Sequence, residues 1–125
     1  MINIDICSVF NYYDSNTENI DSLNLEFIRL NKETLYCENE KLYLILEENK
    51  ITIKKDDKLS YTKVFDLDNY TTAFLKLDNM VMNTKIKTIF LRNTNNHINI
   101  SAKEYSINDE FLSEININIY FKGEN

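Results

Sequence analysis

The chain has 125 residues, of which 43% are hydrophobic and 12% aromatic, with one glycine and no proline. This length fits a single domain over residues 1–125, and the composition is typical of a globular protein without flexible or collagen-like segments. The formal net charge is −6. A negative balance argues against a nucleic-acid or anionic-membrane partner, because both attract clustered positive charge.

The first residues carry no basic start and no continuous apolar core of the kind found in signal peptides. We therefore expect a cytoplasmic protein. Cys7 and Cys37 are the two cysteines, and they show no spacing typical of a metal site or a redox motif. We expect them to remain free thiols, with a disulfide as the alternative.

Turn-forming residues recur at short intervals along the whole chain, and asparagine takes most of these places because it tolerates the left-handed backbone region. Nine turns, separating ten strands, are predicted near Asn16, Asn31, Asn39, Asn49, Asp56–Asp57, Asp66 to Asn69, Asp78–Asn79, Asn93 to Asn96 and Asn108–Asp109. Hairpin after hairpin gives an up-and-down meander, and a long meander tends to close so that no edge stays open. The sequence thus predicts an all-β protein, a single antiparallel up-and-down β-barrel of about 8 to 10 strands.

Two segments also match helical spacing. In residues 20–30, Leu25 and Phe27 alternate as in a strand, but the apolar pattern then changes parity at Ile28, which predicts a β-bulge near Phe27–Ile28. In residues 70–81, the β-branched pair Thr71–Thr72 and the turn at Asp78–Asn79 favour a hairpin over a helix. We interpret both segments as strands.

The charged residues and the one histidine form no recognisable catalytic set. His97 follows two asparagines at the start of a strand, where a partly exposed histidine without a catalytic role is expected. Four lysines gather with Asp56 and Asp57 between residues 54 and 63, which we interpret as a solvated hairpin. No cofactor and no metal ion are predicted, since closed metal sites need Cys and His sets that this chain lacks.

The strand predicted after residue 80 carries the alternation that bears on function. If Ile86 points inward, so do Met80, Met82, Thr84, Thr88 and Phe90, while Lys85 and Lys87 face water. A small barrel is wide enough to be filled by its own side chains or to hold one small ligand. The hydroxyl and thioether groups then either contact a ligand or simply fill the core.

Two stretches also carry a resemblance to a known family. Residues 65–91 run from Phe65 through two turns into a long strand with spaced threonines, and residues 97–122 form a hairpin around Asn108–Asp109. In this order of elements the chain resembles the YwiB-like family, a group of bacterial calycin-like β-barrel proteins of no established function. The resemblance implies a lipocalin-like barrel, although the lipocalin Gly-x-Trp signature is missing because the chain has no Trp.

The first functional hypothesis is a pocket in the barrel interior for a small, mainly apolar molecule. Its predicted contacts are Tyr61, Thr72, Phe74, Met82, Thr84 and Thr88. The alternatives are a ligand-free module for protein–protein interaction or self-association, and an enzyme of unknown reaction. Neither nucleic acid nor a membrane is an expected partner.

Overall fold

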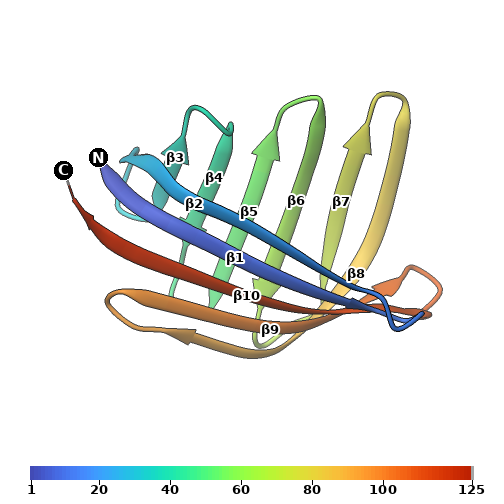
Figure 1. Ribbon diagram of the computed structural model, residues 1–125. Helices are drawn as coiled ribbons and strands as arrows, with labels where there is room; N and C mark the ends of the chain where they lie inside the picture. Colours follow the sequence, from blue (N-terminus) through green and yellow to red (C-terminus); the bar gives the residue numbers. More distant parts are fainter. Residues whose placement is uncertain (125) are drawn as a thin grey trace.

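Ten β-strands make up the structure, a computed structural model that describes residues 1–124 (Figure 1). The strands are β1 (Ile2–Tyr12), β2 (Thr17–Arg29), β3 (Thr34–Cys37), β4 (Leu42–Leu46), β5 (Lys50–Asp56), β6 (Leu59–Asp66), β7 (Thr71–Leu77), β8 (Met80–Asn93), β9 (His97–Ser106) and β10 (Phe111–Glu124). No helix forms within these residues.

Each strand pairs antiparallel with its neighbours in the sequence, and β1 pairs with β10 to close the barrel. The predicted up-and-down topology is therefore confirmed. All nine predicted turns lie between consecutive strands, and residues 71–93 form the β7–β8 hairpin rather than a helix. Turn chemistry and alternation identified these elements because both act over short stretches of sequence.

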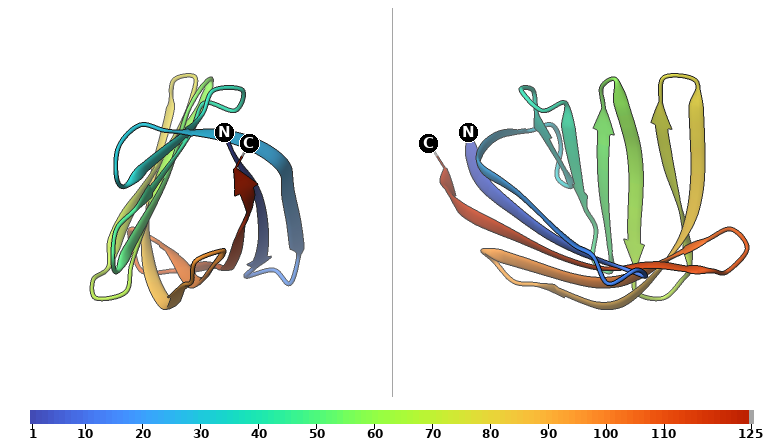
Figure 2. Two further views of the ribbon diagram at one scale, coloured as in Figure 1. Left: turned by 90° about the vertical axis from the view of Figure 1, so that its left-hand side faces the viewer. Right: turned by 45° about the vertical axis from the view of Figure 1, so that its right-hand side comes forward.

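Two groups of strands give the barrel its shape. The long strands β1, β2, β9 and β10 run side by side along one wall, and the shorter strands β3 to β7 rise across them on the other (Figures 1 and 2). Strand β8 bends from one group into the other. This strand contains a β-bulge, because Thr88 pairs with Ala102 and Phe90 pairs with Ser101, which leaves Ile89 as an extra residue.

Apolar side chains from both walls fill the part of the interior near the chain termini. The largest fully buried side chains include Phe27, Phe65, Leu35, Leu44 and Ile4. They come from strands on both walls, so they hold the two groups of strands together. Aliphatic and aromatic residues dominate this core, as the alternating pattern predicts.

The bulge in β8 overturns the predicted direction of Phe90. One extra residue, Ile89, reverses the alternation, so that Phe90 is 45% exposed instead of inward. Met80 and Met82 are largely exposed near the end of the hairpin, whereas Thr84 and Thr88 are buried as predicted.

The predicted bulge in β2 exists but lies elsewhere. Ile4 pairs with Leu25 and Ile6 pairs with Ser22, so the extra residue lies at Leu23–Asn24 and not at Phe27–Ile28. Asn24 has a φ of 56°, and its N–H donates to Asp5 Oδ1 over 2.7 Å. The bulge is thus held by a side chain of the neighbouring strand.

Asparagine does not fill the left-handed positions of the turns. Ser15, Lys41, Asp78 and Asp109 have positive φ values there, and Asn24 has one in the bulge. The turn asparagines act through their side chains instead. Asn31 Oδ1, for example, accepts from the N–H groups of residues 33 and 34.

The ladder that closes the barrel between β2 and β3 is short. It contains only two residue pairs, Ile28 with Tyr36 and Arg29 with Leu35. Residues 17–27 of β2 pair with β1 on one side and with no strand on the other. The two walls therefore separate along residues 17–27 of β2. The barrel interior is open beside this part of the strand.

Candidate functional site

The end of the barrel away from the packed core contains a cavity of about 300 Å³. Ligand pockets in proteins typically measure roughly 300–1,000 Å³, so this one suits a small molecule. Its lining is mostly apolar and comes from eight strands. The lining residues are Ile6, Ser8, Phe10, Tyr12, Glu18, Ile20, Ser22, Leu42, Ile53, Leu59, Tyr61, Lys63, Leu75, Glu104 and Ile117.

A second hollow of about 270 Å³, called here the side hollow, adjoins this interior cavity. Four residues line both: Tyr12, Lys63, Leu75 and Glu104. The other residues of the side hollow are Tyr13, Ala73, Phe74, Met82, Thr84, Leu112 and Ser113.

A charged pair lies where the two hollows meet. Lys63 on β6 and Glu104 on β9 approach to 3.7 Å between Nζ and Oε1, with side chains 22% and 13% exposed. The other carboxylate oxygen of Glu104 accepts a hydrogen bond from the Thr84 hydroxyl. Glu104 is thus fixed from two directions in a surrounding that is otherwise largely apolar.

The ammonium group of Lys63 also lies over an aromatic ring. Its Nζ is 5.2 Å from the ring centroid of Phe10, which suits a cation–π contact. The expectation of a solvated lysine hairpin was therefore wrong for Lys63, and Lys55 is also only 22% exposed. Lys54 and Lys58 do face solvent, but Lys63 shares the inward face of β6 with the buried Phe65.

Tyr12 and Glu18 form a second polar contact at the cavity wall. The Tyr12 hydroxyl donates to Glu18 Oε1 over 3.0 Å across the β1–β2 ladder. Burial raises the pKa of Tyr12, and the hydrogen bond to Glu18 and the negative charges of Glu18 and Glu104 raise it further. The hydroxyl therefore stays protonated at neutral pH.

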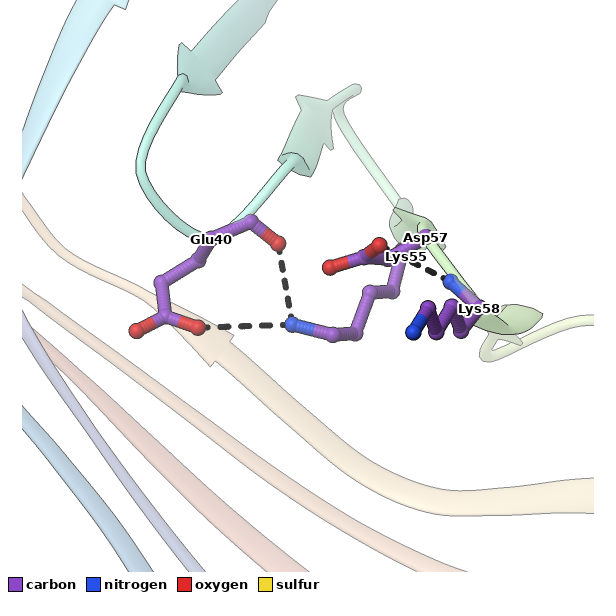
Figure 3. A network of polar contacts seen from close by, with 4 residues as sticks. All are labelled: Glu40, Lys55, Asp57 and Lys58. Atoms are coloured by element: carbon purple, nitrogen blue, oxygen red, sulfur yellow. Dashed lines mark hydrogen bonds and ion pairs between the residues drawn. The ribbon is translucent and has the colours of Figure 1, made fainter.

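A third polar contact joins the turn between β3 and β4 to strand β5. Lys55 Nζ on β5 donates to the backbone oxygen of Glu40 over 2.9 Å and lies 3.3 Å from its carboxylate (Figure 3). The turn at Asp57–Lys58, which joins β5 to β6, lies beside it in the same view. Burial, and then the charge of Glu40, raises the pKa of Tyr61 in the cavity wall.

Four of the six predicted ligand contacts line the hollows. Tyr61 lines the interior cavity, and Phe74, Met82 and Thr84 line the side hollow.

The other two predicted contacts do not line either hollow. Thr72 is exposed and pairs with Lys85, so it lies on the outer face of β7. Thr88 is buried in the core. The positions of β8 that were predicted to point inward therefore fall into two groups. Met82 and Thr84 line the side hollow and Thr88 lies in the core, because β8 is longer than the hollow part of the barrel.

Sequence reasoning missed Lys63 and Glu104, the two residues at the centre of the site. The alternation itself contained the signal. Lys63 is two residues before the buried Phe65, and Glu104 is two residues after the buried Ala102, so each points to the same side of its strand as a core residue. Charged side chains were read as outward, because lysine and glutamate are seldom buried unless paired. The partners, 41 positions apart, meet only in the closed barrel.

Other candidate groups lie outside the cavity. The His97 ring stacks on Tyr120 at 4.6 Å and its Nε2 lies 2.8 Å from Asn118 Oδ1. Cys7 and Cys37 are both free thiols, as predicted, and burial followed by a hydrogen bond with Asp21 raises the pKa of Cys7. Within residues 1–124, no three His, Cys, Asp or Glu side chains converge to hold a metal ion.

None of the described residues belongs to a helix long and apolar enough to cross a membrane.

No protein-family model matches the chain, and no curated protein matches it either. Among solved structures, the chain is similar to the crystal structure of the ywiB protein from Bacillus subtilis, with a TM-score of 0.63 and 16% sequence identity. The match covers 98% of this chain and 92% of that one. The predicted resemblance is confirmed at the level of the fold, because the two chains are similar over nearly their whole lengths.

Proposed function

We propose that the protein binds a small, mainly apolar molecule in the open end of its barrel. The observation that carries this proposal is the cavity of about 300 Å³, which the chain's own side chains leave unfilled beside a continuous cluster of buried apolar residues. A mostly apolar lining with a few placed polar groups is the usual composition of a ligand site.

The charged pair in the lining supports the same proposal. Taking a lysine and a glutamate out of water costs about as much as their attraction returns, so such a pair adds little to stability compared with apolar residues. Lys63 and Glu104 are only 22% and 13% exposed. A role in orienting a bound molecule gives a reason for polar groups at this position that folding alone does not.

Binding is proposed in preference to catalysis. The cavity lining contains no histidine or cysteine, and His97 is engaged with Asn118 and Tyr120 away from it. A cytoplasmic location is proposed as well, and the free thiols Cys7 and Cys37 support it, because reducing compartments keep thiols unpaired. The net charge of −6 supports a function that involves neither nucleic acid nor a membrane surface.

Self-association is a second candidate, favoured by one specific feature. The tip of the β7–β8 hairpin exposes Leu77, Met80, Val81 and Met82, with Met80 71% exposed. Exposed apolar patches of this kind often mark contact surfaces. The two candidates are compatible, since a second copy would cover the hairpin tip and leave the cavity formed.

Fluorescence titration with Nile red, an uncharged apolar probe, tests the binding proposal. We expect saturable binding to the wild-type protein, and a loss of about tenfold or more in affinity for Ser8→Phe, which places a large ring inside the cavity. Thr72→Phe is the matched control, because it adds the same ring to the outer face of β7, outside the cavity. Circular dichroism checks that each variant keeps its strands.

No saturable binding by the wild-type protein, or equal binding by all three proteins, would overturn the proposal. If Ser8→Phe does not fold, Leu75→Trp replaces it, because Leu75 lines both hollows. Sedimentation velocity on the same samples shows whether binding occurs in a monomer or in a larger assembly, which separates the cavity from the hairpin tip as the site.

A further inference from the structure

We infer that the cavity selects molecules whose polar end is an ammonium group. This inference rests on the proposed function and adds the chemical class of the ligand. It starts from the charges of the cavity lining, which are one lysine, Lys63, and two glutamates, Glu18 and Glu104, for a net charge of −1. The lysine is already paired with Glu104, so the unbalanced charge belongs to Glu18.

The protein's own lysine shows how the cavity accommodates a cation. The Lys63 ammonium lies between the face of Phe10, at 5.2 Å, and the carboxylate of Glu104, at 3.7 Å. An aromatic face and a carboxylate are the partners that hold an alkylammonium group, through cation–π attraction and an ion pair.

A second pair of an aromatic ring and a carboxylate lies beside the first. It consists of Tyr12, two residues after Phe10 on β1, and Glu18 on β2. The Tyr12 ring stacks on the Phe10 ring with centroids 6.3 Å apart, and its hydroxyl donates to Glu18. Among residues 1–124, no basic side chain lies within salt-bridge distance of Glu18. An ammonium group of a ligand would therefore meet at Tyr12 and Glu18 the partners that Lys63 meets at Phe10 and Glu104.

An anionic end group would be disfavoured at the same place. Burial, which opposes a charge of either sign, is the largest cause of the raised pKa of the Tyr12 phenol. The next causes are the hydrogen bond to Glu18 and the charges of Glu18 and Glu104, and these oppose a negative charge in particular. A carboxylate on a ligand would meet the same opposition. The apolar remainder of the lining, including Ile20, Leu59 and Leu75, would cover the hydrocarbon part of the ligand.

Displacement of bound Nile red by octylamine, octanol and octanoate tests the inference, because these molecules share a chain length and differ in the charge of the end group. At pH 7 we expect octylamine to bind about tenfold more tightly than octanol, a difference of about 1.4 kcal/mol, and octanoate to bind least tightly. Glu18→Gln should remove the advantage of octylamine, measured as the ratio of the octylamine affinity to the octanol affinity in the same variant.

Glu26→Gln is the matched control, since Glu18 and Glu26 are both exposed glutamates of β2 and only Glu18 lines the cavity. The advantage of octylamine should survive this change. If octanol or octanoate binds as tightly as octylamine, or if Glu26→Gln acts like Glu18→Gln, the inference is overturned while the proposed function stands. If neither Nile red nor any of the three molecules binds, both fail.

Discussion

At the scale of single residues, two threonines on one strand show how a polar group in the barrel interior depends on its partner. Thr84 and Thr88 both lie on the inward face of β8 and are 7% and 6% exposed. The Thr84 hydroxyl donates to Glu104, whereas Thr88 Oγ1 is buried without a hydrogen-bond partner among the described residues. The two threonines are almost equally buried, but the Thr84 hydroxyl is expected to stabilise the fold and the Thr88 hydroxyl to destabilise it.

Replacing each threonine with the nearly isosteric valine tests this difference. Thr84→Val removes a hydrogen bond to a charged acceptor, so the free energy of unfolding should fall by about 1.5–3 kcal/mol. Thr88→Val removes an unpaired buried hydroxyl, so the free energy of unfolding should stay the same or rise by about 1 kcal/mol. Urea melts of the two variants measure both values, and equal losses would show that the hydroxyl of Thr88 does contribute to stability.

Residue-scale predictions from the sequence succeeded where only alternation was needed. The buried positions Thr84 and Ile86 follow directly from it. Alternation did not reveal that Lys63 and Glu104 meet, because their contact joins β6 to β9 across the interior. It also could not show that Thr88 lies in the core, since the position of the cavity along β8 depends on where the opposite wall ends.

At the scale of secondary-structure elements, the strands and turns were predictable and the bulges were not. A turn depends on a few adjacent residues, so local chemistry identified all nine. A bulge depends on the register of two strands, and a shift of one residue reverses every later side chain. The wrong position assigned to the β2 bulge and the wrong direction assigned to Phe90 have this common cause.

The bulge in β2 is expected to depend on the backbone freedom of Asn24. Residues other than glycine and asparagine lose roughly 1–2 kcal/mol in the left-handed region, so Asn24→Ala should lower the free energy of unfolding by about 1 kcal/mol. Asn24→Gly should be close to the wild-type protein, because glycine adopts this φ freely.

Thermal or urea unfolding of the two variants measures these differences. Asn19→Ala serves as the control, because Asn19 is an exposed asparagine in the same strand without a positive φ. If Asn24→Ala and Asn24→Gly lose equal stability, the bulge is held by the Asn24 side chain, which contacts Lys122, and not by its backbone.

At the scale of the whole molecule, the barrel has a packed end and an open end. Near the termini, side chains from both walls meet, and Leu44 on β4 is fully buried there. At the other end, β2 separates from β3 after two residue pairs, and Leu59 on β6 lines the cavity while remaining 38% exposed. Stability and binding are therefore assigned to opposite ends of one closed sheet.

This division predicts different outcomes for the same substitution at the two ends. Leu44→Ala leaves a void in a close-packed core, so the free energy of unfolding should fall by about 2–5 kcal/mol. Leu59→Ala removes a side chain that already borders open space, so the loss should be below about 1 kcal/mol. For the binding of Nile red the order should reverse under conditions where both variants are folded, because only Leu59 lines the cavity.

Urea melts and Nile red titrations of the same two preparations make the comparison. If Leu59→Ala destabilises the protein as strongly as Leu44→Ala does, the open end is part of the core and its cavity closes in solution. If Leu44→Ala weakens probe binding more than Leu59→Ala at equal folded fraction, the probe enters the packed end instead. Either result would contradict the division of the barrel into a stabilising end and a binding end.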